Sequence, residues 1–88
     1  ASVSNARLIC TELADGGVRL MLAREAGAAK HVFVERTHEL YKSGQVNKPE
    51  AEAVLWVIEY VYNSDETHQT IRQPMFKACM KEMGYSGA

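Results

Sequence analysis

Two short motifs place a carboxylate three residues before a histidine: Glu35 precedes His38, and Asp65 precedes His68. In di-iron helical bundles, a Glu and a His at this spacing lie on one helix face and bind the metals. The di-iron pattern is incomplete in this sequence, because Asp65 is better explained as a helix cap. The remaining glutamates are not clearly directed inward, and a di-iron centre is therefore not predicted.

Three side chains could instead hold a divalent ion at the surface of one helix. His31, Glu35 and His38 recur at positions 0, 4 and 7 of a helical face, and imidazole and carboxylate groups are common metal ligands. The same pattern also describes an ordinary solvated helix face, which is the more common arrangement. We therefore keep a small metal-binding helical protein as the alternative function, and expect no cofactor.

No motif for covalent or phosphate chemistry is present. The sequence has no nucleophile elbow, no phosphate-binding glycine loop and no zinc-protease motif. Gly16 and Gly17 do not form a phosphate loop, because the Lys and the Ser or Thr that should follow are missing. We predict a protein without a catalytic centre.

Composition narrows the class of protein further. The 88 residues are 47% hydrophobic and 24% charged, which is typical of a folded domain and not of a disordered chain. The formal net charge of −1 argues against a nucleic-acid partner, because nucleic-acid-binding domains carry an excess of Lys and Arg. No apolar run approaches the roughly 20 residues that cross a bilayer, so we expect no membrane insertion.

Cys10 and Cys79 are the only cysteines and lie near opposite ends of the chain. Neither has a second cysteine nearby, as structural zinc sites require. A catalytic thiol would need a general base, which the sequence does not place. Two free thiols or one disulfide remain as interpretations. The chain starts at Ala1 without Met, as expected either after removal of a signal peptide or from a trimmed start.

The spacing of apolar residues predicts a single all-α domain over residues 1–88, with four helices. The first helix begins after a cap at Ser4 or Asn5 and ends at Gly27. Two glycines at positions 16–17 weaken it, and they also permit a β-hairpin with its turn at this point. The strong helix formers that follow these glycines favour the helix.

Three further helices are expected. The second covers Ala28 to Lys42, and a linker over residues 45–48 separates it from a third helix with Pro49 in its first turn. The last helix ends near Met83 and either begins or is kinked at Pro74, which cannot donate a backbone hydrogen bond. The inward residues expected on the second helix are Ala29, Phe33, Leu40 and Tyr41.

The third helix is the most apolar element, and it is either central to the fold or covered by a partner. Its inward stripe consists of Ala51, Val54, Leu55, Ile58, Val61 and Tyr62. Its solvent-facing stripe consists of Glu52, Trp56, Glu59 and Asn63. Trp56 either packs on the second helix or serves, with Tyr60, as an anchor for a partner. Glu52 and Glu59 flank that candidate anchor.

A frame of five residues, Cys10, Met21, Arg24, Glu25 and Gly27, resembles small exported two-cysteine helical proteins of proteobacteria and phages. The sequence is also similar in outline to HdeA-type periplasmic chaperones and to Tai/Rap-type immunity proteins. The resemblance implies a removed signal peptide and a periplasmic or secreted location. It also implies a disulfide between Cys10 and Cys79.

The expected protein is thus an all-α, four-helix domain whose first and last helices are joined by a disulfide. Its expected function is protein–protein binding, as an inhibitor, an immunity protein or a chaperone-like factor. The mechanism would be burial of an apolar helix face against a protein partner or a second copy.

Overall fold

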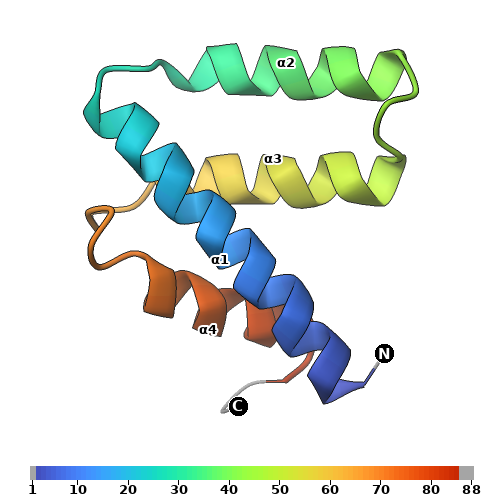
Figure 1. The fold of residues 1–88 in the computed structure, drawn as a ribbon, viewed down its shortest axis with the longest axis vertical. Coiled ribbons are helices and arrows are strands. Elements are labelled where there is room, and N and C mark those ends of the chain that lie inside the picture. The colour runs from blue at the N-terminus through green and yellow to red at the C-terminus, as the bar shows by residue number, and fades with distance from the viewer. Residues whose placement is uncertain (1, 86–88) are drawn as a thin grey trace.

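The computed structural model describes residues 2–85, which form four helices and no strand. They are α1 (Val3–Glu25), α2 (Lys30–Lys42), α3 (Lys48–Tyr62) and α4 (Arg72–Glu82). Helices α2 and α3 run side by side in opposite directions, while α1 runs diagonally across α3 and α4 and packs on both (Figure 1). The molecule is flat, with extents of 33 × 31 × 15 Å. The predicted all-α, four-helix fold is confirmed.

A disulfide joins the first and last helices, as the resemblance implied. Cys10 of α1 and Cys79 of α4 are bonded, with their Cα atoms 5.6 Å apart and a separation of 69 positions in sequence. Ala6 and Met80 are buried beside the sulfur atoms and complete a small apolar cluster. The first and last helices are therefore joined within the core.

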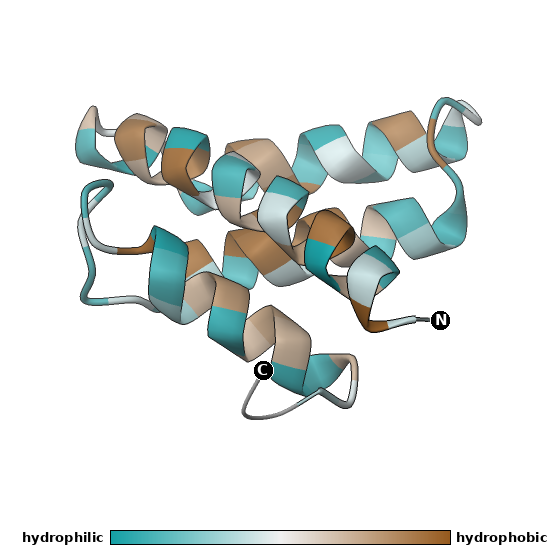
Figure 2. Ribbon diagram, turned by 60° about the horizontal axis from the view of Figure 1, so that its bottom comes forward, coloured by the Kyte–Doolittle hydropathy of each residue, from teal (hydrophilic) through white to brown (hydrophobic). Residues whose placement is uncertain are grey.

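A second cluster joins α1, α3 and the start of α4. It consists of Met21, Val57, Val61, Ile71 and Met75. Apolar and polar residues are interspersed along every helix (Figure 2). Met21, Met75 and Met80 are almost completely buried, so these unbranched side chains fill the core.

Helix α1 continues through both glycines, and the alternative hairpin does not form. Its N-cap is Ser2, whose hydroxyl accepts a hydrogen bond from the Asn5 backbone N–H at 3.2 Å, whereas the cap was predicted at Ser4 or Asn5. Gly17 is buried where α1 crosses α4, and a Cβ atom there would overlap the Met75 sulfur. The absent side chain at position 17 is thus what allows close packing, since Met75 occupies the space it would take.

The two glycines should respond in opposite directions to alanine. Gly16→Ala meets only the Arg19 guanidinium at 3.8 Å, so the better helix propensity of alanine should stabilise the fold by up to about 1 kcal/mol. Gly17→Ala must displace the buried Met75, an overpacking cost of about 1–3 kcal/mol that outweighs the same gain. Urea unfolding of the two variants measures the difference. Equal midpoints would contradict the packing role of Gly17.

Helix α2 is more exposed than its sequence predicts. Thr37 is its one buried residue, and its hydroxyl donates to the Phe33 carbonyl at 2.8 Å. Phe33 and Leu40 are half-buried as expected, but the predicted inward residues Ala29 and Tyr41 are exposed. The reason is that α2 packs mainly on α3 and is covered along one narrow stripe.

The starting points of α3 and α4 are determined by residues close to them in sequence. Asn47 and Glu50 form a reciprocal capping box at the start of α3, with both hydrogen bonds 2.8 Å long and Pro49 in the first turn. Helix α4 begins at Arg72, so Pro74 lies in the first turn, where its missing N–H breaks no intrahelical bond. None of the helices within residues 2–85 combines the length and the apolar character needed to cross a membrane.

Candidate functional site

Arg24, near the C-terminal end of α1, forms hydrogen bonds with the C-terminal end of α3. Its Nη1 atom donates to the carbonyl oxygens of Val61 and Ser64, both at 2.8 Å. The guanidinium also lies over the Tyr62 ring, 5.8 Å from its centroid. A cation at a helix C-terminus satisfies carbonyls that have no partner within the helix. Arg24 therefore acts as a cap supplied by another helix.

Glu25 holds the loop between α3 and α4. Its two carboxylate oxygens contact His68: one accepts from the backbone N–H at 3.0 Å, and the other lies 2.7 Å from Nδ1. The hydrogen bond from the His68 backbone, followed by that from its side chain, lowers the pKa of Glu25. His68 thus pairs with a residue 43 positions away and not with Asp65 of its own motif.

The lowered pKa of Glu25 predicts a pH-dependent contribution to stability. Because the unfolded chain takes up this proton first as the pH falls, the contribution is complete above the ordinary glutamate pKa of about 4.3. It is lost as the pH falls through the lowered pKa of the folded state. The stability difference between the wild type and Glu25→Gln should therefore be constant near neutral pH and shrink below that value.

Urea unfolding at pH 7 and at about pH 3 tests this expectation. Glu35→Gln is a suitable control, because Glu35 is exposed on α2 and makes no hydrogen bond or ion pair within residues 2–85. If the wild type and Glu25→Gln lose stability in parallel between the two pH values, the contact with His68 contributes nothing to folding.

The five residues that carry the resemblance all have structural roles in this chain. Cys10 forms the disulfide, Met21 is a core residue, and Arg24 and Glu25 secure the segments that follow α3. Gly27 has a φ of +101° in the turn after α1, a conformation that side chains with a Cβ rarely adopt. The frame therefore builds the scaffold of the protein and does not form a reactive site.

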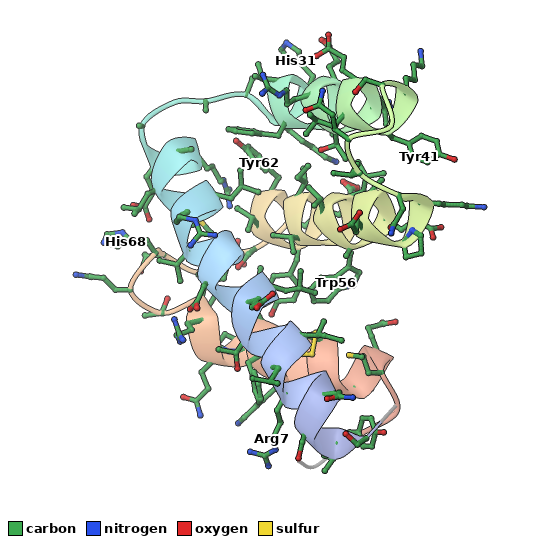
Figure 3. All side chains as sticks on the ribbon, turned by 45° about the vertical axis from the view of Figure 1, so that its right-hand side comes forward. Arg7, His31, Tyr41, Trp56, Tyr62 and His68 are labelled. Atoms are coloured by element: carbon green, nitrogen blue, oxygen red, sulfur yellow. A yellow bond between two sulfur atoms is a disulfide. The ribbon has the colours of Figure 1, made fainter. Side chains whose placement is uncertain are left out.

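The candidate metal ligands do not gather into a site. His31, Glu35 and His38 are exposed on α2, and His31 points away from the other helices (Figure 3). Within residues 2–85, no group of three His, Cys, Asp or Glu side chains is close enough to hold a metal ion. No observation in the described part of the chain favours the metal-binding alternative.

Trp56 lies between helices and not on the solvent-facing stripe to which its spacing assigned it. It is half-buried on the side of α3 that faces α4 and packs against both core clusters (Figure 3). Its ring is 5.4 Å from that of Tyr60. Helices α3 and α4 both pack on α1, and Trp56 contacts the apolar clusters that each of them forms with α1. The assignment to a solvent stripe is therefore wrong for this residue.

A shallow hollow is present beside these two rings. Its other lining residues are Glu59, Asn63 and Ser64, whereas Glu52 is exposed outside it. Glu59 forms an ion pair with Lys30 of α2. Burial, and secondarily the nearby Glu66 carboxylate, raise the pKa of Tyr60. The hollow brings together Trp56, Tyr60 and Glu59 of the predicted anchor, but its aromatic residues already pack within the fold.

A larger apolar groove lies between α1, α2 and α3. Its volume is about 640 Å³, and it is partly open to solvent. Its floor is formed by α3, one wall by α1 and the other by α2. The apolar lining residues are Leu13, Leu20, Phe33, Leu40, Val54, Val57 and Ile58. Val54 on the floor remains 42% exposed, so this groove leaves apolar surface in contact with water.

Two arginines border the groove from opposite walls. Arg19 belongs to α1 and Arg36 to α2, and both are exposed. Neither makes a hydrogen bond or an ion pair within residues 2–85. Asp15, which also lines the groove, is already paired with Arg72 of α4. The groove thus combines an apolar floor with two positive charges that have no hydrogen-bond or ion-pair partner among residues 2–85.

Comparison with protein-family models, with curated proteins and with solved structures found no match to this chain. The candidate site therefore has to be chosen from the surfaces themselves. Trp56 and Tyr60 pack against the core of the protein. In contrast, Val54 is exposed, and Arg19 and Arg36 make no hydrogen bond or ion pair within residues 2–85. On this ground the groove is the better candidate for binding a partner.

Sequence reasoning missed the groove, although one signal pointed toward it. The apolar stripe of α3 is wider than a single neighbouring helix can cover, and Val54 lies at its edge. The spacing assigned Val54 to the inside, while the structure leaves it at the bottom of an open groove. No pattern in the sequence distinguishes Arg19 and Arg36 from other exposed arginines.

Proposed function

We propose that this protein is an exported protein-binding module that holds part of a partner protein in the groove between α1, α2 and α3. It would act as an inhibitor, an immunity protein or a chaperone-like factor, without chemistry of its own. The observation that carries the proposal is the exposed Val54 on an apolar floor formed by three helices. Burying such a surface against a partner is favourable at about 25 cal/mol per Å² of apolar area.

The disulfide supports the proposed location outside the cytoplasm. Disulfides persist in oxidising compartments, and small domains with limited cores often depend on them. Alkylation of denatured, unreduced cell extracts tests the location directly. Cys10 and Cys79 should resist modification until a reductant is added. Alkylation of both thiols without reduction would place the protein in a reducing compartment and contradict export.

Photo-cross-linking from the groove tests the binding function. A photoreactive amino acid in place of Val54 should give a covalent adduct with a partner protein in the cells that make this protein. The same amino acid in place of Val32 is the control, because Val32 is 52% exposed on α2 and does not line the groove. Equal adducts from both positions, or none from position 54, would contradict the proposal.

A pair of charge substitutions gives the matching affinity prediction. Val54→Glu places a charge on the apolar floor and should weaken competition for the cross-linked partner by at least about tenfold, or 1.4 kcal/mol. Val32→Glu should compete as well as the wild type. Both sites are substantially exposed, so the two variants should unfold at similar urea concentrations, and this equality is the control for folding.

A further inference from the structure

We infer that the occupant of the groove is an amphipathic α-helix of the partner protein, with acidic residues on both sides of its apolar stripe. This inference rests on the proposed binding function and adds the chemistry of the bound segment. It depends on the spacing of the lining residues, the space between α1 and α2, and the charge at the rims.

Lining residues recur at helical spacing on each of the three helices. The sets are Leu13, Gly16 and Leu20 on α1, Phe33, Thr37 and Leu40 on α2, and Val54, Val57 and Ile58 on α3. Rows of side chains three, four and seven residues apart form the ridges between which a neighbouring helix packs. Three such rows face the same groove, so a further helix could pack against all of them at once.

The space for this helix exists because α1 and α2 diverge. Both pack on α3, but α1 runs diagonally away from α2, and the groove is what remains between them (Figure 1). Gly16 lowers the α1 wall because it has no side chain, and the nearest atom to the position of the missing Cβ is in the Arg19 guanidinium, 3.8 Å away. A side chain or the backbone of an incoming helix can therefore approach α1 closely at Gly16.

The charge of the rims selects an acidic partner. Arg19 and Arg36 project from opposite walls without partners in the described chain, and Asp15 is neutralised by Arg72. Glu12 is the remaining acidic residue of the lining. A helix with carboxylates on both sides of its apolar stripe would place one near each guanidinium, whose planar fork suits a carboxylate. A basic helix would meet two like charges at the same places.

The shape of the groove favours a protein segment over a small molecule. Small-molecule sites usually enclose most of their ligand, whereas this groove remains partly open along the molecule. An amphipathic helix needs only one of its faces covered, and such helices commonly bind in open apolar grooves. A fatty acid would satisfy the same charges and is therefore included in the test.

The test uses two designed peptides of about 18 residues, long enough to form a helix on binding. One has leucines at positions three and four residues apart, flanked by glutamates, and the other has lysines in place of the glutamates. Titration into the isotopically labelled full chain, followed by two-dimensional amide NMR, maps the site and gives the dissociation constant. Only the glutamate peptide should bind tightly, with the largest shifts around Leu13, Thr37 and Val54.

Charge reversal identifies the two arginines as the selecting residues. The double variant Arg19→Glu and Arg36→Glu should bind the glutamate peptide at least about tenfold more weakly and should now prefer the lysine peptide. Arg7→Glu is the matched control, since Arg7 is exposed on α1 outside the groove, and it should bind like the wild type. All three sites are exposed, so circular dichroism should show unchanged folding.

Several results would overturn the inference. These are equal binding of both peptides, shifts outside the groove, no binding of the glutamate peptide, and shifts produced by palmitate alone. Cross-linking from position 54 shows whether only the inferred acidic helix is wrong or whether the proposed binding function is wrong as well. An adduct whose partner segment is neither helical nor acidic would overturn the inference and leave the binding function standing. Absence of the adduct would remove the binding function itself.

Discussion

Removal of the Cys10–Cys79 disulfide should destabilise this protein by about 4 kcal/mol. The bond closes a loop of 69 residues, and the chain-entropy model assigns about this cost to opening such a loop in the unfolded chain. Native domains are stable by only about 5–15 kcal/mol, so the reduced protein should be close to its unfolding threshold. Urea unfolding of the oxidised and reduced wild type measures the effect.

The double variant Cys10→Ala and Cys79→Ala provides the control for this experiment. It should unfold at nearly the same urea concentration as the reduced wild type and should not respond to reductant. Both cysteines are buried, so a modest additional loss from the missing sulfur atoms is expected in the variant. A change of less than about 1 kcal/mol on reduction would show that the α1–α4 contact alone holds the chain ends together.

Arg24→Met should cost about 2–4 kcal/mol, the largest effect expected of any exposed or half-buried polar residue described here. The substitution keeps an unbranched side chain but removes two hydrogen bonds from a charged donor, each contributing about 1.5–3 kcal/mol. It also leaves the carbonyls of Val61 and Ser64 without this cap. The loss should be less than the full sum, because water reaches part of the site.

Arg19→Met is the matched control for Arg24→Met. Arg19 lies on the same helix, is exposed, and makes no hydrogen bond or ion pair within residues 2–85, so its replacement should change stability by no more than about 0.5 kcal/mol. Arg24→Lys should be intermediate, since an ammonium keeps the charge but lacks the planar geometry of the guanidinium. Equal stability of the Arg19 and Arg24 variants would contradict the capping role.

The helices were predictable because their determinants are local. The glycine that ends α1 and the proline in the first turn of α3 act within a few residues of their own positions, and the structure bears out these elements. Caps were less well predicted: the N-cap of α1 is Ser2 and that of α3 is Asn47, and the spacing of apolar residues reveals neither.

The candidate site was less predictable because it depends on how the helices cross. Periodicity indicates that one side of α3 is apolar, but not that α1 and α2 approach it from two directions and bury Val57 while exposing Val54. Trp56 was misassigned for the same reason, since the space it fills exists only between packed helices. Arg24 and Glu25 make contacts 37 to 43 residues away, beyond the reach of any local pattern.

The position of the disulfide has a consequence for a protein exposed to proteases. Cys10 and Cys79 enclose all three interhelical connections, including the turn after α2 around Gly44. Exposed turns are the usual sites of proteolytic cleavage. A single cut in any of these turns would leave two chains still joined covalently through α1 and α4. Such a nicked molecule would retain every residue of the groove, so the proposed binding would survive a single break in the backbone.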